Sequence, residues 1–208
     1  MAVGDVVDQL ELRSGEHILV RPIRPADSGQ LAELHSRLSP DSIYLRYFGV
    51  KPRLSPAEIQ RFTSIDTEWR FALVGVRNTG DLVGVARYEG EADSTAAEIA
   101  LIVDDALHRE GLGGSLLRRL IDVARLSGMA SLNAMVLQSN TAMLRLLQAL
   151  PVPARSARDM GTAVVTLDLR NLELPDDRLR IAIAHVADAA AIRATSNRCL
   201  VTPIDLKM

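Results

Sequence analysis

The fold of this chain is decided by the stretch Ile99-Ala-Leu-Ile-Val103-Asp-Asp-Ala-Leu-His108-Arg-Glu-Gly111-Leu-Gly113-Gly114-Ser-Leu-Leu-Arg-Arg-Leu120. Its apolar start, from Ile99 to Val103, is typical of a buried strand. A turn with three glycines follows. A helical pattern then begins, with apolar residues spaced i, i+3, i+4 and i+7 at Leu117, Leu120, Ile121 and Ala124. The stretch therefore predicts a strand, a glycine turn and a helix in direct succession.

This arrangement also suits the binding of an anion. The first turn of a helix carries backbone N–H groups without intrahelical partners and a partial positive charge, and both attract phosphate. Glycines let a ligand approach the backbone closely and permit positive φ angles. The alternative is a tight strand-to-helix turn that binds nothing, because glycine marks turns in every class of fold.

The spacing of the glycines narrows the kind of phosphate ligand. A Walker A loop needs a lysine after its glycines, and Gly113-Gly114-Ser115 offers none. A dinucleotide-binding loop needs a third glycine where this chain has Leu116. The remaining spacing is Gln/Arg-x-x-Gly-x-Gly/Ala, which His108 to Gly113 fill. It resembles the acetyl-CoA pyrophosphate loop of the GNAT superfamily of N-acetyltransferases.

Composition and charge exclude several classes of protein. The chain has 208 residues, 48% of them apolar and 24% charged, an ordinary balance for one globular domain with an appendage. The formal net charge of −2 argues against a nucleic-acid partner, which usually requires a basic surface. Cys199 is the single cysteine and the four histidines lack metal-ligand spacing, so neither a disulfide nor a metal site is expected.

The sequence shows no signal for export or membrane insertion. Its first residues are acidic and lack a basic start with an apolar core, so we expect no signal peptide. No apolar run reaches the length that spans a bilayer. We therefore expect a cytoplasmic protein without a membrane partner.

The other elements follow from apolar periodicity, caps and turns. Asp27 is a candidate N-cap, Ser55-Pro56 a helix start, and Gly49 and Gly128 helix ends. The polar segment 89–95 is expected to be a loop. The predicted strands are 17–24, 71–76, 82–88, 97–103, 132–137 and 163–169. Five helices are predicted. The first follows Asp27 and has an apolar face of Leu31, Leu34, His35 and Leu38. The others span 41–49, 55–62, the stretch from the glycine turn to Gly128, and the stretch from Asn140 to Leu150.

This order of elements predicts a mixed α/β fold. It implies three layers, with helices on both faces of a central, mostly antiparallel sheet. It is also the order of the GNAT fold, over residues 12–170. Residues 171–208 form a C-terminal extension, either an extra packing element, a dimer contact or a truncated second copy of the first strand and helix. A monomer or a homodimer is accordingly expected.

Three further stretches carry a narrower resemblance. They are His17-Ile-Leu-Val-Arg-Pro-Ile-Arg-Pro-Ala-Asp27, Leu38-Ser-Pro-Asp-Ser-Ile-Tyr-Leu-Arg-Tyr-Phe48, and Arg53-Leu54-Ser55 with Arg61-Phe62-Thr63. They look like the acetyltransferase domain of the bacterial Pat-type protein lysine acetyltransferases. In that family the domain is often joined to a cyclic-nucleotide-binding or acyl-CoA-synthetase-like domain. The resemblance therefore implies a catalytic module whose regulation is absent or supplied by another protein.

Acetyl transfer to an amine requires a base, because a lysine amine is almost entirely protonated at neutral pH. Glu98 is the candidate, since it stands in an apolar strand and shares one face with Ala100 and Ile102. We expect its carboxylate to be partly desolvated, which suits a base. The Pat resemblance implies the same role.

The alternative for Glu98 is a strand-end glutamate that faces water. Three other acids, Glu89, Glu91 and Asp93, are weaker candidates because they lie in the expected loop. The choice between these carboxylates depends on their burial.

The resemblance implies an acetyl-CoA site around the glycine turn. The strand edge should offer backbone groups to the pantetheine arm, and the turn should hold the pyrophosphate. The expected contacts are Leu101, Ile102, Val103, His108, Arg109, Glu110, Gly111, Leu112, Gly113, Gly114, Ser115 and Asn140. His108 stands where the family mostly has Gln or Arg, and Glu110 stands where it often has arginine. Asn140 is also a plain helix N-cap candidate.

Two family features are missing on the acceptor side. The tyrosine that often serves as general acid is replaced in its region by Met143, Leu144 and Leu147, and a usual Gly-Phe pair by Ala149-Leu150. Three functions stay open. The first is acetylation of a protein lysine, which we expect. The second is the same reaction on a small amine. The third is a CoA-binding sensor that catalyses no reaction.

Overall fold

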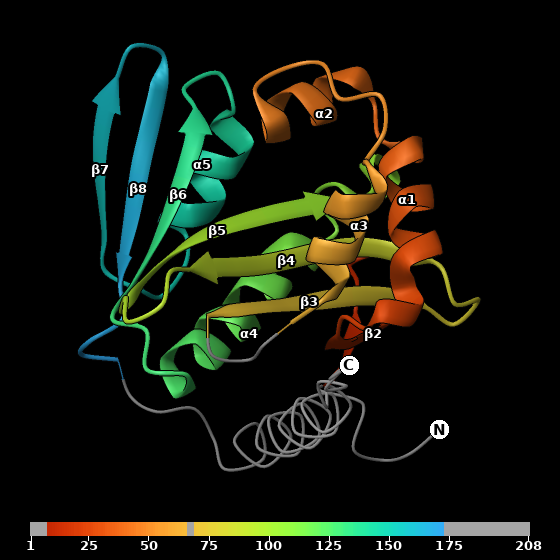
Figure 1. The fold of residues 1–208 in the computed structure, drawn as a ribbon, viewed down its shortest axis with the longest axis horizontal. Coiled ribbons are helices and arrows are strands. Elements are labelled where there is room, and N and C mark those ends of the chain that lie inside the picture. Colours follow the sequence, from red (N-terminus) through yellow and green to blue (C-terminus); the bar gives the residue numbers. More distant parts are fainter. Residues whose placement is uncertain (1–7, 66–68, 173–208) are drawn as a thin grey trace, which may run out of the picture.

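A computed structural model describes residues 8–65 and 69–172 of the chain. In this part, eight strands form one sheet in the order β1-β2-β3-β4-β5-β6-β8-β7 (Figure 1). Neighbouring strands are antiparallel except β5 and β6, which are parallel. The strands are β1 (Asp8–Glu11), β2 (His17–Pro22), β3 (Arg70–Arg77), β4 (Leu82–Gly90), β5 (Ala96–Val103), β6 (Ser131–Leu137), β7 (Ala154–Asp159) and β8 (Thr162–Asp168).

Helices cover both faces of the sheet, so the predicted three-layer mixed α/β fold is confirmed (Figure 1). α1 and α3 pack on one face, with Tyr47 of α2 against the same cluster. α4 and α5 pack on the other face. The helices are η2 (Pro25–Asp27), α1 (Ser28–Arg37), α2 (Pro40–Tyr47), α3 (Pro56–Thr63), η3 (Asp105–Leu107), α4 (Leu112–Leu126) and α5 (Thr141–Gln148).

The central strands are apolar on both sides because both sides are covered. On β3, Phe71 and Leu73 pack in the cluster of α4, whereas Ala72 and Val74 pack in the cluster of α1. Such doubly buried strands appear in a sequence as continuous apolar runs rather than as alternating ones. This accounts for the uninterrupted pattern from which β3, β4 and β5 were predicted.

Two glycines bring α4 close to the sheet. Gly75 of β3 and Gly84 of β4 are cross-strand partners. A Cβ at Gly75 would lie 3.1 Å from a methyl of Leu112, and a Cβ at Gly84 would lie 3.1 Å from a methyl of Leu116. The glycine pair therefore forms a shallow seat for the first turns of α4. Both leucines are fully buried there.

The predicted order of elements is confirmed, but two edge strands were missed. Every residue of β7 is exposed, and β1 shows only one half-buried position. Without a buried face, neither strand has the apolar alternation from which a strand is predicted. In the described part of the chain, the first strand of the sheet starts at Asp8. The C-terminal extension lies outside the described residues from position 173 onward.

Asp27 is the N-cap residue of α1, as predicted, but its side chain makes no cap bond, because its carboxylate accepts hydrogen bonds from the Arg21 side chain and from the backbone N–H of Arg24, each at 2.7 Å. The predicted end of α2 is wrong. Phe48, not Gly49, takes the left-handed conformation that ends α2, with φ of 59°. The predicted Ser55 cap of α3 is confirmed, since its hydroxyl accepts from the Glu58 backbone N–H.

Candidate functional site

The site is built where β5 and β6 separate. β5 pairs with β4 from Ala97 to Val103 but with β6 only from Ala96 to Glu98. Figure 1 shows the two parallel strands diverging beyond that point. Among the described strands, the second edge of β5 thus has no strand partner after Glu98. An extended ligand can use such an edge for backbone hydrogen bonds, as an added strand does.

The glycine turn connects this edge to α4. Arg109 and Gly111 take positive φ angles of 68° and 96°, and Gly111 is the N-cap of the 15-residue helix α4. Apart from its neighbours along the chain, no described atom lies within 4 Å of the position of a Cβ at Gly111, so the space on this side of the turn is open. The first N–H groups of α4 face this space without intrahelical partners. These features fit a phosphate group.

The next two glycines lie where packing is close. A Cβ at Gly113 would lie 3.1 Å from Leu101 of β5, and a Cβ at Gly114 would lie 3.3 Å from Leu146 of α5. Glycine at these positions lets the start of α4 approach both elements. The side chains of Leu112 and Ser115 are buried in the protein. A ligand in front of α4 would therefore contact the backbone of these two residues and not their side chains.

Hydrogen bonds join the glycine turn to the turn between β1 and β2, and we call this set of bonds the brace. The Glu110 carboxylate accepts a hydrogen bond from the Ser14 backbone N–H at 2.8 Å, and Arg13 donates to the Arg109 carbonyl at 3.1 Å. His108 Nε2 lies 3.2 Å from the Val103 carbonyl. The negative charge of Glu110 is thus engaged by the turn between β1 and β2. This brace joins residues 96 positions apart, so sequence periodicity could not reveal it.

Asn140 is the N-cap of α5. Its side-chain Oδ1 accepts a hydrogen bond from the Met143 backbone N–H at 3.0 Å. The cap interpretation is therefore confirmed. A contact between this amide and a CoA arm stays a prediction, as do the other ligand contacts expected on β5 and the glycine turn.

Glu98 lies on the α1 and α3 face of β5, with Ala100 and Ile102, but its side chain is exposed. The expectation of partial desolvation is therefore wrong. In the sheet, Glu98 is opposite Glu89 of β4 on one side and Asn133 of β6 on the other. Its role as the base stays a prediction.

Glu89 belongs to β4 and not to the expected loop 89–95. Its side chain is 25% exposed. Arg61 Nε donates to Glu89 Oε1 at 2.9 Å, and Arg87 Nη2 donates to Oε2 at 3.0 Å. Both carboxylate oxygens accept from guanidinium groups, so Glu89 is held as the ion-pair partner of two arginines.

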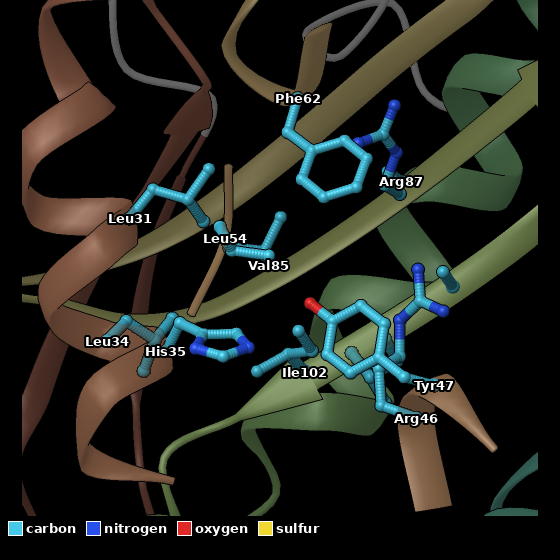
Figure 2. A pocket seen from close by; sticks show the side chains of 12 residues that line it. Leu31, Leu34, His35, Arg46, Tyr47, Leu54, Phe62, Val85, Arg87 and Ile102 are labelled. Carbon is cyan, nitrogen blue, oxygen red and sulfur yellow. The ribbon is translucent and has the colours of Figure 1, made fainter. Parts of the chain in front are cut away.

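A pocket opens on the same face of β4 and β5, under α1, α2 and α3 (Figure 2). Its apolar walls include Leu31, Leu54 and Val85. Its polar lining is His35, Arg46, Tyr47 and Arg87, and its floor includes Ala100, Leu101 and Ile102 of β5. The pocket therefore borders the part of β5 that was expected to hold the pantetheine arm.

The profile of the Acetyltransferase (GNAT) family matches residues 35–150, which is more than half of the chain and includes the whole glycine turn. The chain belongs to the GNAT acetyltransferase family. As a GNAT, it is similar to Acetyltransferase PA5475 of Pseudomonas aeruginosa, at 32% identity over 157 residues that cover 74% of this chain and 84% of that protein.

Pat-type GNAT proteins are also similar. Acetyltransferase Pat of Mycolicibacterium smegmatis is 26% identical over 90% of this chain, which spans only 56% of that longer protein. The solved GNAT domain of S. lividans PAT superposes with a TM-score of 0.74 at 28% identity, covering 81% of this chain and 99% of that domain. The resemblance to the Pat-type domain is therefore confirmed.

The pocket of this GNAT has a strongly perturbed polar lining. The pKa of Arg87 is lowered to about 10, chiefly by burial, with Glu89 opposing this effect and the neighbouring arginines adding to it. Burial also raises the pKa of the Tyr47 hydroxyl. Burial lowers the pKa of His35, so this imidazole is mainly neutral at neutral pH.

Sequence reasoning missed most of this pocket. His35 was placed on the apolar face of its helix, and Arg87 was not assigned to any site. Arg87 had one visible signal, because it is the only charged residue in the apolar run from Leu82 to Tyr88. A charge in a strand that is buried on both faces needs a partner, and so points to a site.

The described residues contain no cluster of three or more His, Cys, Asp or Glu side chains that could hold a metal ion. None of the helices in 8–65 and 69–172 is long and apolar enough to cross a membrane.

Proposed function

We propose that this GNAT transfers the acetyl group of acetyl-CoA to a primary amine by direct attack, with Glu98 as the general base. The observation that carries the proposal is the meeting of three features: the edge of β5 that separates from β6, the open helix start at Gly111, and the pocket on the α1 face. Together they offer a place for an extended arm, a pyrophosphate and an acceptor.

The backbone supplies most of the cofactor binding in this proposal. The pyrophosphate sits in front of α4, where the N–H groups after Gly111 and the helix dipole stabilise its charge. The pantetheine arm runs along β5 from Leu101 to Val103. The brace between Glu110 and Ser14 keeps the turn in place, because it fixes the residue that precedes Gly111.

The reaction then needs two proton transfers and one displacement. Glu98 removes a proton from the ammonium group of the acceptor. The neutral amine attacks the thioester carbonyl, the C–N bond forms, the C–S bond breaks, and the second amine proton passes to the departing thiolate, which leaves as CoA. Glu98 suits this role better than Glu89, because two arginines already engage both oxygens of Glu89. Its exposure also lets the proton pass to water.

A protein lysine is the acceptor that the Pat resemblance suggests. A small amine is the second candidate, and a specific observation favours it: the pocket that borders β5 is narrow and has a polar lining. A flat protein surface is recognised over a broad interface, whereas a small amine needs such a concave site.

The test is incubation of the purified chain with acetyl-CoA and panels of proteins and small amines, followed by mass spectrometry of every acceptor. We expect a mass increase of one acetyl group on a primary amine and release of CoA. Calorimetric titration with acetyl-CoA is the companion measurement. Binding without any acetylated product would favour the CoA-binding sensor, and absence of binding would contradict the proposal.

A further inference from the structure

Three buried nitrogen atoms without a hydrogen-bond partner lie in one pocket. They are His35 Nε2, Arg46 Nε and Arg87 Nη1, and they are the only such side-chain atoms found in the described part of the chain. Figure 2 shows the two guanidinium groups on one side of the pocket and the His35 ring on the other. Buried polar groups are nearly always paired in native proteins. Three unpaired nitrogen atoms around one pocket therefore indicate that the pocket binds a ligand.

The charge of the pocket indicates the chemistry of that ligand. Arg87 is only 8% exposed, and its guanidinium lies 4.3 Å from the centre of the Phe62 ring. Arg46 lies over the Tyr47 ring and has no carboxylate within ion-pair distance among the described residues. The charge of Arg46 also disfavours the protonated form of Arg87, which shows that the two cations repel each other.

An anion between these arginines would offset that repulsion and supply a partner for the unpaired donors. A carboxylate is the best match, because its two oxygens fit the planar donor fork of a guanidinium. The surrounding walls of Leu31, Leu54 and Val85 fit a short aliphatic group attached to it. The two guanidinium groups would repel a protonated amine, so the amine of an acceptor would have to lie outside the space between them.

We propose that this pocket binds a substrate carboxylate, which belongs either to the amine acceptor or to the acyl group of the acyl-CoA. This inference rests on the proposed acyl transfer and specifies its substrate class. Both sources are compatible with the geometry, because the floor of the pocket is Ala100, Leu101 and Ile102, beside the expected position of the thioester. On a protein acceptor, the carboxylate is an acidic side chain next to the lysine.

The experiment compares matched substrates that differ only in a carboxylate. In the acceptor arm, acetyl-CoA is combined with a peptide whose lysine has a neighbouring Glu, or with the matched Gln peptide, and L-lysine is compared with cadaverine. In the acyl arm, succinyl-CoA and butyryl-CoA are compared with one carboxylate-free amine. Release of CoA gives kcat/KM. We expect a higher kcat/KM for the carboxylate substrate in one arm, which identifies the source.

Arg87→Met and Arg46→Met are the variants, and Arg61→Met is the matched control. Arg61 bonds to the same Glu89 as Arg87 does, but it does not line the pocket and its side chain is 60% exposed. We expect each pocket variant to lose roughly 10- to 100-fold in kcat/KM for the carboxylate substrate, the value of one charge-assisted hydrogen bond. The carboxylate-free partner should change much less, and the control should preserve the preference.

A binding measurement tests the carboxylate site independently of catalysis. Succinate and its neutral analogue succinamide are titrated into the ¹⁵N-labelled chain, and the Nε–Hε signals of Arg46 and Arg87 are followed by NMR. Signals that move with succinate alone support the carboxylate site even if no acceptor turns over, in which case only the proposed function has failed. No preference in either arm together with unmoved signals would overturn the inference, and so would equal losses on both members of a substrate pair in Arg87→Met.

Discussion

Glu89 of β4 and Glu98 of β5 are directly opposite each other in the sheet, yet their surroundings differ. Both oxygens of Glu89 accept from arginine side chains, whereas Glu98 is exposed and no described residue forms an ion pair with it. Glu89 is therefore a structural carboxylate, whereas the carboxylate of Glu98 is accessible to water. It is the reason that Glu98 stays the candidate base despite its exposure.

Replacement of Glu98 by Gln tests this assignment. The amide cannot take a proton, so kcat/KM at neutral pH should fall by roughly 10²- to 10⁴-fold, as for a lost general base. Part of the rate should return at high pH, where the free amine is abundant. Acetyl-CoA affinity, measured by calorimetry, should hardly change. Glu91→Gln in the exposed loop is the control, and wild-type turnover in Glu98→Gln would exclude Glu98 as the base.

Gly113 tests the anion site. Gly113→Asp places a carboxylate at the start of α4 and should abolish the increase in melting temperature that saturating acetyl-CoA gives the wild type. Gly113→Ala adds only a methyl group, 3.1 Å from a terminal atom of the Leu101 side chain, which can move slightly. The alanine variant should keep most of the ligand-induced increase. Equal behaviour of the two variants would show that crowding, not charge, controls binding here.

The pair of Asp27 and Arg21 should contribute to stability. Their side chains are 6% and 11% exposed, and their two hydrogen bonds are 2.7 Å long. Asp27→Ala leaves the Arg21 charge buried without a carboxylate, which should lower the free energy of unfolding by roughly 3–5 kcal/mol. The exposed Asp41 in the first turn of α2 is the control, with an expected loss below about 1 kcal/mol. Urea denaturation measures both, and equal losses would contradict the prediction.

Glu58 should give a stability difference that depends on pH. A hydrogen bond from Lys51, together with bonds from Ser55, lowers the pKa of Glu58 from 4.5 to about 2. A depressed pKa in the folded state stabilises the fold above the ordinary pKa and ceases to do so as pH falls through the folded value. Glu58→Gln should therefore be less stable than the wild type at neutral pH.

That difference should shrink as the pH falls from about 4.5 towards 2, the interval between the ordinary and the lowered pKa of Glu58. Thermal unfolding across this range measures it. Glu33→Gln, on the exposed side of α1, is the control and should show no such convergence. A constant difference between wild type and Glu58→Gln at every pH would contradict the assigned cause.

Elements with a buried face were predictable from the sequence, and elements without one were not. The strands under α4 and α1 have continuous apolar runs, whereas β7 has no buried residue. Glu89 was assigned to a loop because its segment is polar. Its place in β4 depends on the pairing with Glu98, and pairing is a property of two segments that no local pattern contains.

The glycine turn was predictable because its chemistry is local, from strand end to helix start. The pocket was not, because His35, Arg46, Phe62 and Arg87 come from four different elements. Likewise, the bond between Glu110 and Ser14 joins distant segments. Distances between such residues are set by the topology of the sheet and not by spacing along the chain.

The seat formed by Gly75 and Gly84 has a consequence for how members of this fold can diverge. Leu112 and Leu116 lock α4 along its own axis, since sliding would lift both methyl groups out of the notch. The connection between Asp104 and Gly111 has anchors of its own, the buried side chain of Leu107 and the bond from the Ser39 backbone N–H to Asp105 at 2.6 Å. The seat, and not this connection, sets how closely α4 approaches β3 and β4. A change of loop length between members of the fold should therefore leave that separation unaltered, so the seat acts as a fixed molecular ruler.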